Sequence, residues 1–157
     1  MVDLRRLSYG GTAGIITSMA LISAFDAAAA PKSTIVASLL IVAVADNITD
    51  SLSIHVYQES ERLSEADAFR STLTNFLTRV TAALSFVGLV LILRTDMVVY
   101  VCLAWGFVLL GMMTFFLAKV RQVSAFSEVW KHCAVAAVVI AVSKVIGTWT
   151  SIATQNL

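Results

Sequence analysis

Charged residues and proline are scarce in this chain of 157 residues, of which 13% are charged and one is proline. Hydrophobic residues make up 59%, and the mean hydropathy is +0.87. An ordinary soluble domain is closer to half apolar and a quarter charged, so this composition excludes one and indicates a membrane protein. The net charge is +1 and basic residues form no run, so nothing in the sequence points to nucleic-acid binding.

Cysteine and catalytic motifs are scarce as well. The two cysteines, Cys102 and Cys133, fall in or beside apolar stretches, without the spacing of a disulfide framework or a zinc site. The sequence has no HExxH, no GxSxG, no Cys/His cluster and no cofactor fingerprint. We therefore expect a protein that is not an enzyme and that holds no permanent cofactor.

Long apolar stretches dominate what is present. A helix that crosses a bilayer needs about 20 mostly apolar residues, and five stretches qualify: 9–27, 33–57, 74–93, 97–118 and 132–153. The first follows Arg5 and Arg6, but further spans come after it, which favours a membrane helix over a cleaved signal peptide. The predicted fold is an all-α, polytopic membrane protein that forms one domain over residues 1–157.

The connections between these spans are short except one. Pro31 fits the start of the second helix, and Arg94 to Asp96 form a tight turn between the third and fourth spans. The polar stretch at 58–73 is predicted to be a short helical segment on the cytoplasmic side.

Lysine and arginine are distributed unevenly between the two sides. If the N-terminus is cytoplasmic, eight lie at or near the inside, two lie outside and Lys144 lies within the fifth span. The inside set is Arg5, Arg6, Arg62, Arg70, Arg79, Lys119, Arg121 and Lys131, and the outside pair is Lys32 and Arg94. Cytoplasmic loops of membrane proteins carry the excess of positive charge, so we predict the N-terminus inside and the C-terminus outside.

The second span carries two carboxylates, Asp46 and Asp50. Charged groups within a membrane span are expensive and mark functional sites. At about 100° per residue, an oxygen-rich stripe falls within one arc of the helix; it comprises Asp46, Thr49, Asp50, Ser53 and Tyr57. Such oxygens suit hard divalent cations, and the carboxylates could also carry protons. His55 points to the opposite side, where a solvated histidine near the interface is the simpler interpretation.

Lys144 is a candidate charge partner for this stripe. Counted from His132 and from Tyr57, Lys144 and Asp46 both lie about 17–18 Å from the cytoplasmic side, at 1.5 Å per residue. Since a buried lysine needs a partner, the sequence predicts a Lys144–Asp46 ion pair, either functional or only ordering the helices.

Small residues repeat every four positions in the first span, at Gly10, Gly14 and Ser18. This pattern lets two helices approach closely, either within the chain or across a homodimer. Acidic residues follow the second span, and Glu59, Glu61 and Glu65 could collect cations at a cytoplasmic entry or could simply be solvated.

Three short stretches are YGGTAGIIT at 9–17, TDSLS at 49–53 followed by QESE at 58–61, and SKVIG at 143–147. Together they resemble the vacuolar iron transporter family, whose members have five membrane helices and a cytoplasmic N-terminus. In this alignment Ala13 replaces a family aspartate, Asp50 matches a family glutamate, Asp46 a methionine and Lys144 a tyrosine.

The resemblance implies a homodimer with a cation path between the protomers, moving ferrous or manganous ions in exchange for protons. It implies a metal site with Asp50 from both protomers and with Asp46, Ser53 and Thr17 nearby. These ligands are all oxygens, which favours magnesium or manganese over softer metals.

The functional hypothesis is therefore proton-coupled export of a divalent cation from the cytosol, in a membrane that we expect to be prokaryotic and cytoplasmic. Two alternatives remain open. One is a non-transporting membrane scaffold with the same fold, and the other is a transporter of another small cation.

Overall fold

The chain folds into a bundle of long helices. The computed structural model describes the backbone of residues 4–60 and 64–154, together with the side chains in these ranges except those of 4–10, 58 and 59. The elements in chain order are α1 (Leu4–Ala27), α2 (Lys32–Ile41), the π-helical turn η1 (Val42–Asp46), α3 (Asn47–Ser60), α4 (Glu65–Ile92), α5 (Thr95–Val120) and α6 (Ala125–Thr154). The helix is continuous from α2 through η1 to α3, because the residues at both junctions keep helical dihedral angles.

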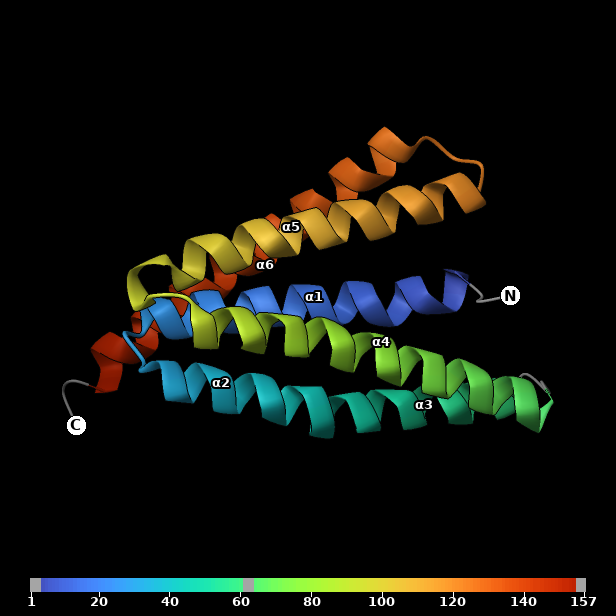
Figure 1. Cartoon of the computed structure of the whole chain (residues 1–157), viewed down its shortest axis with the longest axis horizontal. Coiled ribbons are helices and arrows are strands. Elements are labelled where there is room, and N and C mark those ends of the chain that lie inside the picture. Colours follow the sequence, from blue (N-terminus) through green and yellow to red (C-terminus); the bar gives the residue numbers. More distant parts are fainter. Residues whose placement is uncertain (1–3, 61–63, 155–157) are drawn as a thin grey trace.

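Successive rods of the bundle run in opposite directions (Figure 1). At the end of the bundle where α1 begins, which we call the N-terminal end, α3 and α5 end and α4 and α6 begin. At the opposite, C-terminal end, α1, α4 and α6 end and α2 and α5 begin. Helix α1 is central and packs on α4, α5 and α6, whereas α3 packs mainly on α4 and α6 packs on α1 and α5. One long face of α2, η1 and α3 is therefore left open.

In the described part of the chain, four rods are long and apolar enough to cross a membrane: Lys32–Tyr57, Glu65–Ile92, Thr95–Val120 and Ala125–Thr154. The apolar part of α1, Gly11–Ala27, is shorter. This confirms the prediction of an all-helical protein whose helices are long and apolar enough for a membrane. The number of crossings and the orientation stay predictions.

The bundle is apolar outside and partly polar inside, as expected for a protein with lipid as its solvent. Large side chains such as Ile92, Phe126 and Trp149 are exposed. The apolar core occupies the half of the bundle near the C-terminal end, where residues such as Met19, Leu39 and Phe86 are fully buried. In the other half the interface between α3 and α4 buries polar side chains, namely Asn47, Ser51, Ser71, Asn75 and Arg79.

Several helix ends differ from those predicted. Helix α4 begins at Glu65 instead of 74, with Ser64 as its N-cap accepting from the Asp67 amide at 3.2 Å, and α6 begins at Ala125 instead of 132. Within the predicted helical segment at 58–73, residues 58–60 end α3 and residues 65–73 begin α4, and residues 61–63 lie outside the described residues. Hydropathy finds only the apolar part of a helix, whereas the backbone continues through polar residues until a cap ends it. Pro31 precedes α2 as predicted, at its N-cap.

A strict four-residue spacing of buried residues explains the π-helical turn. The stripe of α2, η1 and α3 that faces the bundle comprises Ile35, Leu39, Ala43, Asn47 and Ser51. An α-helix has 3.6 residues per turn, so a spacing of four drifts around the helix. The wider π turn at 42–46 removes part of this drift and keeps Asn47 and Ser51 facing α4.

Glycine sets the closest approach between α1 and α6. A Cβ atom added at Gly147 would lie 2.1 Å from the carbonyl oxygen of Ala24, far inside van der Waals contact. Only a residue without a side chain fits there, so Gly147 fixes the spacing of these two helices.

We predict that Gly147→Ala destabilises the bundle by about 1–3 kcal/mol, the usual range for overpacking, because the backbone of α1 must move. The matched control is Gly88→Ala, where an added Cβ meets nothing within 4 Å and helix propensity favours alanine by up to about 1 kcal/mol. Thermal unfolding of both variants in detergent measures the difference. Equal melting temperatures for the two variants would contradict the close approach.

Candidate functional site: a charged cluster at the middle of the bundle

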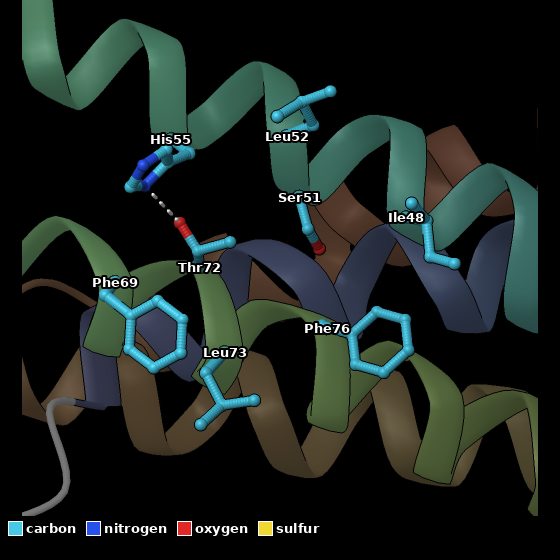
Figure 2. A pocket seen from close by; sticks show the side chains of 8 residues that line it. All are labelled: Ile48, Ser51, Leu52, His55, Phe69, Thr72, Leu73 and Phe76. Atoms are coloured by element: carbon cyan, nitrogen blue, oxygen red, sulfur yellow. Dashed lines mark hydrogen bonds between the residues drawn. The ribbon is translucent and has the colours of Figure 1, made fainter.

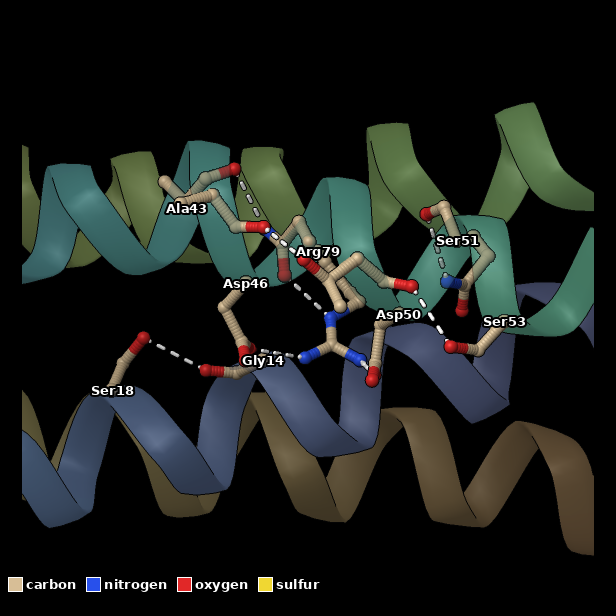
Figure 3. Close-up of polar contacts among 12 residues, drawn as sticks. Gly14, Ser18, Ala43, Asp46, Asp50, Ser51, Ser53 and Arg79 are labelled. Carbon is tan, nitrogen blue, oxygen red and sulfur yellow. Dashed lines mark hydrogen bonds and ion pairs between the residues drawn. The ribbon is translucent and has the colours of Figure 1, made fainter.

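Arg79 of α4 joins both carboxylates of the second predicted span. Its Nη2 donates to Asp46 Oδ2 at 2.9 Å, its Nη1 donates to Asp50 Oδ2, and its Nε donates to Asn47 Oδ1 at 2.6 Å (Figure 3). The arginine side chain is 3% exposed, whereas those of Asp46 and Asp50 are 50% and 47% exposed. A buried cation is therefore bound to two carboxylates that also face outward. We call these three residues, Asp46, Asp50 and Arg79, the charged cluster.

The charged cluster lies halfway along both helices that carry it. Asp46 is at the centre of the continuous helix from Lys32 to Ser60, and Arg79 is near the centre of α4. Helices of this length would place the cluster near the midplane of a bilayer, where unpaired charge is most expensive.

Asn47 and Gly14 hold Arg79 in place. The amide of Asn47 accepts from Arg79 and also donates from Nδ2 to the carbonyl of Ala43 at 2.9 Å, within the π turn. On the other side, α1 lies so close that a Cβ at Gly14 would be 3.3 Å from the Arg79 Cα. The π turn and the glycine thus bring three helices together around one guanidinium group.

The net charge of the cluster is −1, since Arg79 is always protonated and two carboxylates face it. Arg79 binds the Oδ2 atom of each carboxylate. Within the described ranges, no hydrogen bond reaches either Oδ1 atom. The cluster therefore has carboxylate oxygens and one negative charge left for another cation or a proton.

The polar interface continues from the cluster toward the N-terminal end of the bundle. Asn75 Nδ2 donates to Ser51 Oγ at 3.3 Å, and Thr72 Oγ1 lies 3.4 Å from His55 Nδ1. The Oδ1 atom of Asn75 is buried and has no hydrogen-bond partner in the described part of the chain, so it is a free acceptor inside the protein.

His55 is partly buried and faces α4. It borders a groove of about 410 Å³ between α3 and α4, where Thr72 lies opposite it and mostly aromatic and aliphatic side chains form the rest of the lining (Figure 2). The remaining lining residues are Ile48, Ser51, Leu52, Phe69, Leu73 and Phe76. Most of the residues that line the groove are apolar, and Ser51, His55 and Thr72 are its polar members.

The other predicted ligands have mixed positions. Ser53 lies on the same face of α3 as Asp50, but its hydroxyl donates to the carbonyl of Thr49 at 3.0 Å (Figure 3). Thr17 is partly buried on α1, and among the described residues no hydrogen bond joins it to Asp46 or Asp50.

Lys144 does not lie at the predicted depth. On the same helix, the carbonyl of Ile140 accepts from Ser23 Oγ at 3.4 Å, and Gly147 packs against the Ala24 carbonyl. Lys144 falls between these two contacts, so it is level with the last turns of α1. Its side chain is exposed on α6.

The cluster is level with a different part of α1. The backbone of Arg79 packs against Gly14, about ten residues before Ala24, which corresponds to about 15 Å along a helix. The predicted Lys144–Asp46 pair is therefore wrong for the described chain, and Arg79 is the partner of Asp46. The predicted depth of Lys144 is wrong because α6 begins at Ala125, well before the apolar residues that mark the predicted start of the fifth span.

The predicted packing stripe and entry site are only partly described. Gly14 and Ser18 are buried within the chain, and Ser18 Oγ donates to the Gly14 carbonyl at 2.8 Å (Figure 3). Gly10 belongs to α1. Of the acidic residues, Glu65 is exposed at the start of α4, the side chain of Glu59 is not among those described, and Glu61 lies outside the described residues.

Sequence reasoning missed Arg79 as a site residue. It was counted as one of the cytoplasmic positive charges, although it falls inside the predicted third span at 74–93. An arginine within a span needs a partner at the same depth, and that requirement was the signal that could have paired it with the aspartates.

The described residues contain no group of three or more His, Cys, Asp or Glu side chains that could hold a metal ion by themselves. A metal site at the cluster would therefore need additional ligands. Comparison with known proteins gives no match to a family model, a curated protein or a solved structure.

We predict that Arg79→Gln destabilises the protein by about 3 kcal/mol, at the low end of the range for breaking a buried ion pair, because both carboxylates are half exposed. Adding Asp46→Asn and Asp50→Asn restores much of the lost stability, since no charge is then unpaired.

Arg94→Gln is the control. Its ion pair with Asp96 is 84% and 64% exposed, so we expect a change below about 1 kcal/mol. Thermal unfolding in detergent measures all three, and a triple variant that is no better than Arg79→Gln would contradict the charge argument.

Proposed function

We propose that the protein is a membrane transporter that exports a divalent cation from the cytosol in exchange for protons. The observation that carries this proposal is the pair of half-exposed carboxylates at mid-length of a membrane-type helix. An ion pair that only ordered the helices would not need outward-facing carboxylates, whereas Asp46 and Asp50 are half exposed and their Oδ1 atoms accept no hydrogen bond from the described residues.

The exposed carboxylates of the charged cluster support the proposal that a second copy of the chain packs over this face. Around Asp46 and Asp50, the same face of the helix exposes Thr49, Ser53 and Tyr57. Carboxylates halfway along a membrane-length helix cannot face lipid without a large penalty. A homodimer that joins these faces would enclose the carboxylates of both protomers in one path, with five crossings and the N-terminus inside in each.

A homodimer would also complete the ligand set. Two protomers would bring four carboxylates together, and hard divalent cations such as manganese or magnesium prefer carboxylate and other oxygen ligands. Ferrous iron as cargo rests on the resemblance to vacuolar iron transporters alone. Ser53 and Thr17 remain candidate neighbours of the path, and Glu59, Glu61 and Glu65 remain candidates for its cytoplasmic entry.

Proton coupling follows from the charge of the cluster. When the metal leaves, each cluster keeps Arg79 but is left with a net charge of −1, and a proton that binds from the other side restores neutrality. The carboxylates thus exchange two kinds of positive charge in one site, which is the chemical requirement for antiport.

A scaffold without transport is the second candidate, and one observation favours it. Arg79 already neutralises one of the two carboxylates and holds both, as an ion pair that only orders the helices would do. This candidate predicts that Asp50→Asn changes stability but no flux.

The test is flux into sealed liposomes that contain the purified protein, with ferrous, manganous, cobalt and magnesium ions offered in turn and a pH dye inside. We expect entry of at least one divalent ion coupled to proton movement, with a loss of about tenfold or more in Asp50→Asn because a ligand charge is removed. Asp96→Asn is the matched control, since Asp96 is exposed in the first turn of α5. No flux of any offered ion by well-folded protein would favour the scaffold, and proton-coupled flux of a monovalent cation would favour another cargo.

A further inference from the structure

We propose that Arg79 is a resident counter-cation that competes with the cargo for Asp46 and Asp50 and thereby keeps divalent ions weakly bound. This inference rests on the proposed function, because it concerns the same carboxylates. It gives Arg79 a role in determining specificity beyond the structural one.

The contacts of Arg79 place its charge where a cargo ion would bind. Nη1 and Nη2 bind one oxygen from each carboxylate, and Nε binds Asn47. Each nitrogen thus has a different partner, so the guanidinium group bridges the two carboxylates as a metal ion would. In the described part of the chain, Arg79 is the one cation in ion-pair contact with either carboxylate.

Arg79 cannot lose its charge and is too buried to leave the interface. Its guanidinium stays protonated under all physiological conditions, its side chain is 3% exposed, and its backbone is held against Gly14 of α1. A cation that enters the cluster therefore meets a fixed positive charge a few ångströms away.

Counting charges shows the effect on cargo valence. In the proposed homodimer, four carboxylates and two Arg79 side chains together carry −2, which one divalent ion neutralises. Without Arg79 the same four carboxylates carry −4, so a divalent ion would be held by additional uncompensated negative charge. Arg79 should therefore weaken divalent binding, and weak binding helps a transported ion to leave the site.

Release of one carboxylate at a time gives the cargo a way in. Because Arg79 holds Asp46 and Asp50 through separate nitrogens, it can yield one carboxylate to the ion and keep the other. Asn47 then holds Nε in place, so the guanidinium is ready to bind again when the ion departs.

The experiment is titration of the purified full-length protein in detergent with Mn²⁺ and with Na⁺, read by calorimetry and by the shift in melting temperature. We expect Arg79→Gln to bind Mn²⁺ at least about tenfold more tightly than the unaltered protein, because a nearby repulsive charge is gone. We also expect Mn²⁺ to raise the melting temperature of Arg79→Gln more than that of the unaltered protein. The Na⁺ affinities of these two proteins should differ much less than their Mn²⁺ affinities. Arg79→Lys keeps the positive charge and should bind Mn²⁺ more weakly than Arg79→Gln. Asp46→Asn and Asp50→Asn, added to Arg79→Gln, should abolish the gain.

Two results would overturn the inference. One is unchanged or weaker Mn²⁺ binding by Arg79→Gln, and the other is equal binding by Arg79→Gln and Arg79→Lys, which would assign Arg79 a purely geometric role. If Arg79→Gln unfolds on purification, Mn²⁺ added during purification should rescue it, and failure of that rescue also counts against the inference. The failure of the proposed function is separate, because it would appear as absent flux while the Mn²⁺ affinities still follow the charge at residue 79.

Discussion

The buried guanidinium of Arg79 is the interaction on which the middle of this bundle depends. A permanent charge at that depth has to be paired on the spot, since neither lipid nor a hydrocarbon core can solvate it. The pairing with Asp46 and Asp50 ties the helix from Lys32 to Ser60 to α4 at their centres. Together with Ser51 and Asn75 it makes this interface polar in a bundle whose surface is mostly apolar.

Local backbone features serve this pairing. The π turn before Asn47 rotates the polar stripe toward α4, and the Asn47 amide links the turn to Arg79 through its two hydrogen bonds. Gly14 then allows α1 to close over the backbone of Arg79. Single π turns within α-helices are frequently found at functional sites, because they place side chains where a regular helix would not.

The sequence predicted the aspartates as the centre of the site but paired them with the wrong cation. Asp46 and Asp50 were identified because charges in apolar spans are conspicuous. Lys144 was chosen as their partner from depths counted along predicted helices, and those depths depend on helix ends that hydropathy places poorly. Arg79 lies close to the predicted start of the third span, which is why the sequence places it among the cytoplasmic charges. Helix α4 begins much earlier, at Glu65, so Arg79 lies near the middle of the helix.

By itself the sequence determined that the chain is all-helical and built for a membrane, because the length and apolarity of each rod are properties of a single segment. It also determined that carboxylates lie in the second rod. Only the tertiary structure decided that Arg79 binds both carboxylates, that Lys144 lies about 15 Å from their level, and that one face of α3 stays open. These depend on which helices are neighbours and on their register, and packing between segments far apart in the chain sets both.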